Sequence, residues 1–358
     1  MSKGTVRVSV RGRTDLGRTR DHNEDTFLVA DLSTRRSDPT LVEVVEHEVG
    51  PRGSLFMVAD GMGGAAAGEV ASAMASAAIY EHLTTAWPED ADGSGTRFAY
   101  RLREAVEIAN GRIHQYSLDH PDVRGMGTTT TAVVVLGPDL YLAQIGDSRA
   151  YLLRAGETRQ LTKDQSLMQR LVDAGELTEE EAEQSERRNI ILQALGPDPR
   201  VKVDLTHQGL CRGDVLVICS DGLSGVVKRD ELGATVAQHL PDLDAACGAL
   251  IDLANARGGP DNVTVVIARF DGEALPEPAD ATEEVGHHVF AVDEDDIPTA
   301  EHPVVSSGPE AAGGRDGTPD ALAAVAGPAV EVGSPVFKAG VFFAAAVILG
   351  LAALLLLR

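Results

Sequence analysis

The chain contains 358 residues, of which 43% are hydrophobic, so it can bury a sizeable core. Its aromatic content is only 4%, which means that this core must consist mainly of Val, Leu, Ala and Ile. The formal net charge of −24 argues against a nucleic-acid partner, because such proteins neutralise phosphates with Lys and Arg. The acidity suits instead a site that collects cations.

Apolar, β-rich runs bounded by Gly, Pro and Asp alternate with helical patterns along the first part of the chain. The expected strands are 27–30, 54–59, 129–136, 140–145, 150–154, 214–219 and 263–270, and the expected helices are 68–87, 96–117, 164–174 and 243–256. Two long helices follow the early strands, and this order differs from the regular alternation of a doubly wound sheet. The pattern therefore predicts an α+β fold in which helices cover antiparallel sheets. The long connection 33–52 suggests an extra hairpin.

Composition divides the chain into three zones. Residues 1–270 are expected to form the globular domain. Residues 271–337 hold 15 acidic residues, one basic residue and eight of the 17 prolines. Such a segment buries too little apolar surface to offset its ordering entropy, which predicts a disordered linker.

The third zone, residues 338–358, is expected to anchor the protein in a membrane. Residues 339–357 are 19 consecutive residues without a charged or polar side chain. As a helix they would span about 28 Å, close to the thickness of a bilayer's hydrocarbon layer. The first residues show no apolar signal core, so the globular domain is expected on the cytoplasmic side. The three cysteines have no metal-ligand spacing and are expected to be reduced core thiols.

Acidic side chains stand where the apolar strands are expected to end. Asp60 follows LFMVA, Asp147 follows YLAQIG, Asp221 follows VLVICS, and Asp261 lies just before another strand. Gathering carboxylates at the rim of a sheet costs repulsion and desolvation, which a bound divalent cation removes. Oxygen ligands favour Mg²⁺ or Mn²⁺ over zinc. A single Asp-Gly pair is usually only a turn, but the set of four predicts a metal site.

Seven segments resemble, in order, the motifs of the type 2C metal-dependent protein phosphatases of the bacterial branch. They are DLGRTRDHNED at 15–25, DGMGGAAAGE at 60–69, GMGTT at 125–129, IGDSRAY at 145–151, LTKDQS at 161–166, CSDGLS at 219–224 and GGPDNVTVV at 258–266. The resemblance covers about three quarters of the chain. It implies a four-layer αββα sandwich with two central antiparallel sheets, and a mobile flap at about 163–196 beside the active site.

The resemblance also implies roles for individual residues. Asp60 would bridge two metal ions and the Gly61 carbonyl would bind the first, while Asp221 and Asp261 would complete the second. Asp147, with Asp221, would hold a weaker third ion. Glu24 and Asp25 would act mainly through bound waters, Arg20 would grip the substrate phosphate, and Asn262 would position its neighbours.

Together these residues imply hydrolysis of phosphoserine and phosphothreonine in proteins. A water activated between two Mn²⁺ or Mg²⁺ ions would attack phosphorus, and no phosphoenzyme or organic cofactor is needed. Met62 and Ala65 stand where relatives carry histidines that are candidates for the general acid, so the donor to the leaving group is not identified. His22, His114, His207 and the cysteines are expected to be non-catalytic.

Other readings of the sequence remain open. A metal-binding pseudophosphatase that serves as an interaction module would bind metal without turnover. A phosphatase of a small phosphomonoester would show a deep, closed pocket, and a nuclease is disfavoured by the acidity. For a protein phosphatase, the expected partners are phosphoproteins and a membrane Ser/Thr kinase.

Overall fold

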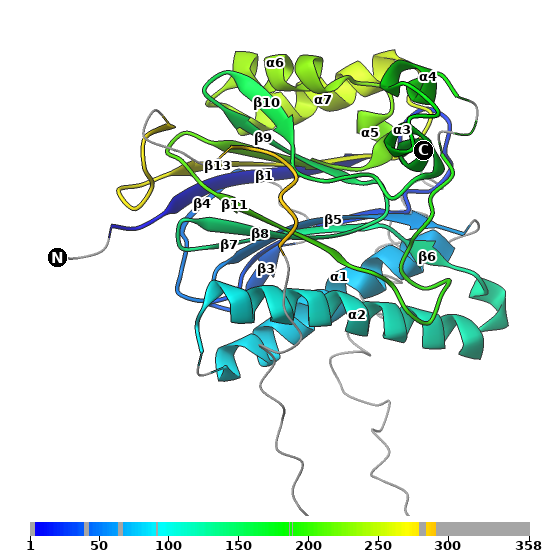
Figure 1. The fold of residues 1–358 in the computed structure, drawn as a ribbon, viewed down its shortest axis with the longest axis horizontal. Coiled ribbons are helices and arrows are strands. Elements are labelled where there is room, and N and C mark those ends of the chain that lie inside the picture. Colours follow the sequence, from blue (N-terminus) through cyan, green and yellow to red (C-terminus); the bar gives the residue numbers. More distant parts are fainter. Residues whose placement is uncertain are drawn as a thin grey trace, which may run out of the picture. The chain divides into compact units, whose positions relative to one another are not determined.

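A computed structural model of the protein describes residues 4–38, 43–63, 67–90, 92–185, 187, 189–278 and 284–290. These residues form two antiparallel sheets stacked face to face, with helices on their outer faces (Figure 1). The four layers confirm the α+β expectation for the globular zone.

The first sheet has the strand order β10-β9-β12-β13-β1-β4. Its strands are β1 (Arg7–Asp15), β4 (Val45–Glu48), β9 (Arg149–Arg154), β10 (Glu157–Gln160), β12 (Val215–Cys219) and β13 (Val263–Asp271). Helices α6 (Arg229–His239) and α7 (Leu243–Ala256) cover its outer face (Figure 1). The short helix α5 (Asp221–Ser224) follows β12 directly.

The second sheet has the order β11-β8-β7-β5-β2-β3, and a short strand, β6, pairs with the end of β5. Its strands are β2 (Asp25–Asp31), β3 (Arg36–Asp38), β5 (Ser54–Met62), β6 (Gly127–Thr128), β7 (Thr130–Leu136), β8 (Asp139–Ile145) and β11 (Asp204–Gly209). Helices α1 (Ala67–Thr85) and α2 (Gly95–Asp119) pack on its outer face (Figure 1). Two short helices, α3 (Leu167–Asp173) and α4 (Glu179–Glu183), lie in the segment expected to be a flap.

The central strands are apolar throughout because both of their faces are buried. In β5, Leu55 and Met57 face the core beneath α1 and α2, whereas Phe56 and Val58 face the core between the two sheets. A third core joins the first sheet to α6 and α7 and contains Val265 of β13. This alternation explains why an uninterrupted apolar run can form a strand: successive side chains pack into two different cores.

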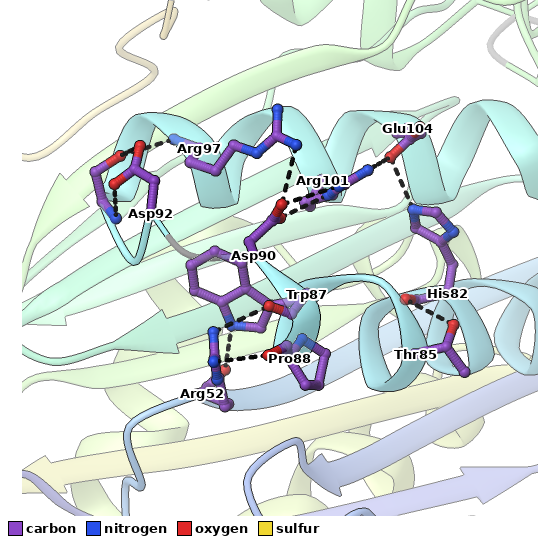
Figure 2. A network of polar contacts seen from close by, with 11 residues as sticks. Arg52, His82, Thr85, Trp87, Pro88, Asp90, Asp92, Arg97, Arg101 and Glu104 are labelled. Atoms are coloured by element: carbon purple, nitrogen blue, oxygen red, sulfur yellow. Dashed lines mark hydrogen bonds and ion pairs between the residues drawn. The ribbon is translucent and has the colours of Figure 1, made fainter. Parts of the chain in front are cut away.

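A polar network fixes the turn between α1 and α2, at the 3₁₀ helix η1 (Trp87–Glu89) (Figure 2). The Arg101 guanidinium donates to both carboxylate oxygens of Asp90, at 2.6 and 2.9 Å, and Arg97 donates to Asp90 at 2.9 Å. Arg101 also bonds Glu104, which lies 2.9 Å from the His82 ring. Because these partners come from both helices and their connection, the network holds the α1–α2 layer in one arrangement.

The connection 33–52 differs from the expected hairpin. Its two short strands, β3 and β4, do not pair with each other, since β3 pairs with β2 in the second sheet and β4 with β1 in the first. The hairpin prediction was therefore wrong. The connection crosses between the sheets because each short strand extends a different one.

Hydrogen-bonded structure continues beyond residue 270. The Arg212 amide donates to the Pro276 carbonyl at 2.8 Å, and residues 284–290 run beside β11. The rest of the predicted linker and the predicted anchor 338–358 lie outside the described residues. Within the described part of the chain, no helix combines the length and apolar character needed to cross a membrane.

Candidate metal centre

The sequence-predicted carboxylates meet at one end of the two stacked sheets. Asp60 of β5 lies directly opposite Asp25 of β2 in the second sheet. The first sheet supplies Asp221, the first residue of α5 after β12, and Asp261, just before β13. Asp147 lies on the loop from β8 to β9, which carries the chain from one sheet to the other.

Asp60 is the electrostatic centre of this group. Burial raises its pKa well above the usual value for aspartate, and the charges of four other carboxylates raise it further: Asp25, Asp221, Asp147 and Asp261. Asp147 is buried, and the other four residues are partly exposed, with 26% of the Asp261 side chain open to solvent.

The neighbours of Asp60 are perturbed in the same direction. Burial raises the pKa of Asp25 to about 7, although Thr264 and Ser220 hydrogen-bond its carboxylate. Burial, followed by the charge of Asp221, raises the pKa of Asp147 to about 7. Asp221 also has a raised pKa, from burial and from Asp261, and its carboxyl group is hydrogen-bonded to that of Asp60. Four acids therefore compete for protons in one recess, which is the electrostatic signature of a cation site.

Hydroxyl groups that the sequence analysis did not single out hold these acids in place. The Ser220 hydroxyl donates to Asp25 at 2.8 Å. The Asp60 amide donates to the Thr129 hydroxyl at 3.1 Å, and the Thr129 hydroxyl lies 2.6 Å from that of Ser148. Each of these residues lies beside a motif aspartate or within a motif, and that adjacency is the signal that could have identified them.

Asn262 ties the loop between β1 and β2 to the site. Its side-chain amide donates to the carbonyls of Leu16 and His22, at 3.0 and 2.9 Å, and its side-chain oxygen accepts from the Glu24 amide at 2.8 Å. One buried side chain thus fixes three points of the loop that carries Arg20. Burial raises the pKa of the Glu24 carboxyl, and the charge of Arg20 partly offsets this increase.

Arg20 lies at the rim of the recess. Its guanidinium is half exposed and donates to the Asp261 carboxylate at 2.7 Å. The hydrogen bond to Asp261 is the main reason that the pKa of Arg20 is raised, and Glu24 and Asp60 add to the effect. A planar cation is therefore held next to the carboxylates with one side open to solvent.

Glycine is required beside Asp60 because the backbone is crowded there. A Cβ atom at Gly61 would collide with the carbonyl oxygens of Gly68 and Glu24. The Gly61 amide donates to the same Glu24 carbonyl at 3.1 Å. The start of α1 and the Glu24 loop can therefore close around the Gly61 peptide only because no side chain intervenes.

The donor set fits hard divalent cations. Carboxylates and a backbone carbonyl, with no histidine or cysteine contributing, are the ligands that Mg²⁺ and Mn²⁺ prefer. Within the described residues, no three acidic, histidine or cysteine side chains form a closed metal cage. The mutual influence of the carboxylates nevertheless shows that they lie close together. Mg²⁺ keeps several water ligands and does not need an all-protein cage, so this group remains compatible with it.

Of the remaining predicted residues, His22 lies on the loop beside Glu24, where its carbonyl accepts from Asn262, and Cys219 lies two residues before Asp221. The His114 ring bonds the Gly196 carbonyl at 2.8 Å, and the His207 ring lies 3.1 Å from Asp139. All three cysteines are buried, and burial raises the pKa of Cys219 and of Cys247 to about 12. Ala65 lies outside the described residues. In the flap segment, Thr178 caps α4 through a capping box, as its sequence predicts.

Comparison with known proteins supplies a family context for this geometry. Residues 43–252 match the family model described as protein phosphatase 2C. The chain is 39% identical over 268 residues to the serine/threonine protein phosphatase PstP of Mycobacterium tuberculosis, covering 75% of this chain but 46% of that protein. It is 36% identical to the serine/threonine phosphatase stp of Listeria monocytogenes, covering 72% of this chain and 94% of the relative.

Solved structures show the same similarity. The catalytic domain of PstP in complex with two manganese ions aligns with a TM-score of 0.60 at 36% identity, covering 75% of this chain and all of that one. The Streptococcus agalactiae serine/threonine phosphatase aligns with a TM-score of 0.63 at 33% identity, covering 73% of this chain and 98% of that one.

Proposed function

Because the chain belongs to the protein phosphatase 2C family, we propose that it hydrolyses phosphoserine and phosphothreonine esters in proteins with Mn²⁺ or Mg²⁺. One observation carries the proposal: acids from both sheets converge on Asp60, with Arg20 beside them. Two similar proteins, the Listeria serine/threonine phosphatase and the PstP catalytic domain with two manganese ions, support the substrate class and the metal.

Each residue of the recess has a task in this reaction. Asp60, Asp221, Asp261 and the Gly61 carbonyl would hold two ions, Asp147 with Asp221 a weaker third, and Glu24 and Asp25 waters around them. When bound, such ions lower the pKa of a coordinated water and neutralise charge on the phosphoryl group.

The protein's own groups orient the substrate. Arg20 offers a planar pair of N–H donors to two phosphate oxygens, which a lysine cannot reproduce. Asn262 fixes the loop that carries Arg20, so the guanidinium is presented from a rigid support. Charge neutralisation and positioning are what a phosphate ester needs most, because its uncatalysed hydrolysis is exceptionally slow.

An assay of the purified full chain tests this function. The substrates are para-nitrophenyl phosphate and a phosphothreonine peptide, each with Mn²⁺ and with a chelator. We expect turnover with Mn²⁺ only, and loss of turnover in Asp60→Asn. Manganese binding without turnover would instead indicate an interaction module. Turnover of small esters alone would indicate a phosphatase of a small phosphomonoester.

We also propose that residues 338–358 anchor the protein in a membrane, with the phosphatase domain on the cytoplasmic side. The 19-residue apolar run at 339–357 supports this, and its length matches a bilayer. An anchored phosphatase would meet a membrane Ser/Thr kinase and its substrates at a raised effective concentration.

Deletion of residues 336–358 tests the anchor. We expect the shortened protein to move from the membrane pellet to the supernatant with its activity retained. Protease treatment of sealed vesicles of known orientation reports the side of the domain. Persistent pelleting of the shortened protein would refute the anchor.

A further inference from the structure

Residues 284–290 run along β11, the edge strand of the second sheet, and pair with it through one isolated β-bridge; they are called the added strand below. The Phe290 amide donates to the Leu205 carbonyl at 2.8 Å, and the His207 amide donates to the His288 carbonyl at 3.3 Å. Between these bonds, Val289 faces Thr206 in an antiparallel bridge. The segment, orange in Figure 1, passes alongside β11. Sequence analysis places these residues in the linker, so their pairing with the globular domain is unexpected.

Side chains hold the segment in place. The Phe290 ring packs against Tyr141 and His207, with ring centres 5.9 and 5.8 Å apart, and contacts the core beneath α1 and α2. Val285 packs against the core between the sheets. Val289, by contrast, is 70% exposed. The segment therefore anchors Phe290 and Val285 in two different cores, one on each face of the second sheet.

Hydrogen bonds connect β11 to the loop that carries Asp147. Asp204, the first residue of β11, accepts from the Gln165 side chain at 3.1 Å. The same side chain accepts from the Gly146 amide at 2.9 Å, and the Gln165 amide donates to the Gly146 carbonyl at 2.9 Å. Gly146 immediately precedes Asp147, so Gln165 forms two hydrogen bonds with the backbone next to one of the clustered carboxylates.

The added strand also lies close to this connection. The His287 ring is half-buried, near enough to Asp204 and Lys163 for their charges to act on it. Its Nε2 atom is buried and makes no hydrogen bond within the described part of the chain. Lys163, two residues before Gln165, is ion-paired with Asp173 of α3 at 2.8 Å. The strand therefore lies near the base of the flap segment as well as beside β11.

We propose that residues 284–290 are a positioning strand, which holds Asp204 and, through Gln165, keeps the Gly146–Asp147 loop in its metal-binding position. A change in this strand would then act on the site through β11 and Gln165. The metal-binding role of Asp147 rests on the proposed function, whereas the connection from residues 284–290 through β11 and Gln165 to Gly146 does not.

Hydrogen–deuterium exchange of the full chain in detergent, without added metal, tests the link. In Phe290→Ala, the strand loses its packing, and we expect exchange at His207, Gln165 and Gly146 to rise about fivefold to thirtyfold, as 1–2 kcal/mol of lost local stability would give. In Gln165→Ala, Gly146 should exchange fast already, and adding Phe290→Ala should change it little.

Two further variants control for general damage. Val289→Ala alters an exposed side chain of the same strand and should leave exchange unchanged. Phe290→Leu keeps an apolar group and should restore most of the protection. Increased exchange at His207 with unchanged exchange at Gln165 and Gly146 would overturn the proposal, as would an equal effect of Val289→Ala. A failure of the phosphatase assay would leave these results intact, so the two proposals fail separately.

Discussion

The guanidinium of Arg20 is bonded to the carboxylate of Asp261 at 2.7 Å, although 241 positions separate them in the chain. The bond joins the loop after β1 to the loop before β13 across the mouth of the metal recess. Asp261 is a proposed metal ligand and Arg20 the proposed phosphate ligand. While the two side chains are bonded to each other, Asp261 is less available to a metal ion and Arg20 is less available to a phosphate. Changing either residue should therefore affect both metal binding and phosphate binding.

Replacement of Arg20 tests this competition. In Arg20→Ala, kcat/KM for a phosphopeptide should fall about ten- to hundredfold, because a hydrogen bond to a charged group contributes about 1.5–3 kcal/mol. Arg20→Lys should recover little, because it lacks the planar fork. Calorimetry should show Mn²⁺ affinity kept or increased, since Asp261 is released. Arg18→Ala removes an exposed arginine from the same loop and should be neutral. Weakened Mn²⁺ binding in Arg20→Ala would contradict the competition.

Asp60→Asn should separate activity from stability. The substitution removes the central carboxylate, so turnover and Mn²⁺ binding should be lost. The metal-free protein should become more stable, because a neutral amide relieves the repulsion among the buried acids. Relief of about 1 kcal/mol would raise the melting temperature by about 2–4 °C. Calorimetry with a chelator measures this, and a lower melting temperature than the wild type would refute the repulsion.

The same acids give the metal-free protein a characteristic pH dependence. Asp25 and Asp147 have pKa values of about 7 in the folded chain, well above the usual value for aspartate. The folded state binds their protons more tightly than the unfolded state does. This contribution to stability is therefore present at low pH and is lost as the pH rises from about 4 to about 7. Saturating Mn²⁺ should reverse the trend, because it binds the ionised form. Melting curves with chelator and with Mn²⁺ provide the test.

Asp147→Asn should be milder than Asp60→Asn. Asp147 lies on the loop between the sheets and is placed at the weaker third ion, so the two main ions should still bind. We expect residual turnover with a raised Mn²⁺ requirement, measured as the half-saturating concentration. Complete loss of turnover at saturating Mn²⁺ would give Asp147 a larger role than the proposed one.

The site was largely predictable because its acids follow strands buried on both faces. An aspartate after an uninterrupted apolar run, as at Asp60 and Asp221, stands at a sheet end whatever the tertiary arrangement. The Arg20–Asp261 bond and the hold of Asn262 on the loop were not predictable in detail, since they depend on how two distant loops pack. The roles of individual residues came from the resemblance to known motifs, because a position at the end of a strand does not by itself assign a role.

Two of the strands that were missed, β1 and β11, carry polar residues into buried positions. β1 reads RVSVRGRTD, and its Arg11 is buried with a 2.6 Å bond to Asp244 of α7. β11 reads DLTHQG and buries Thr206 and Gln208. The partners of Arg11 and Gln208 come from elsewhere in the fold, Asp244 in the first case and the Gly286 amide in the second, so the local pattern resembles a loop. The added strand at 284–290 was missed for the same reason.

Asp90 should contribute strongly to stability without affecting the metal recess. Its carboxylate is 9% exposed and accepts from Arg97 and Arg101 (Figure 2). These bonds, that of Arg101 first, hold its pKa below the usual value. Asp90→Asn removes the charged partner that Arg97 and Arg101 share, leaving Arg101 with Glu104, and should lower the unfolding free energy by about 1.5–3 kcal/mol in denaturant titrations.

The pH dependence of the loss of unfolding free energy in Asp90→Asn distinguishes an ion pair from packing alone. Folded Asp90 binds its proton less tightly than the unfolded chain does. Its contribution is therefore complete above about pH 4 and disappears as the pH falls through the folded value. The difference between wild type and Asp90→Asn should shrink over that range. Asp92→Asn, at an exposed aspartate two residues away whose hydrogen bonds among the described residues go to Ser94, should change stability by about 0.5 kcal/mol or less. A difference that persisted unchanged at low pH would show that shape, not charge, makes Asp90 important.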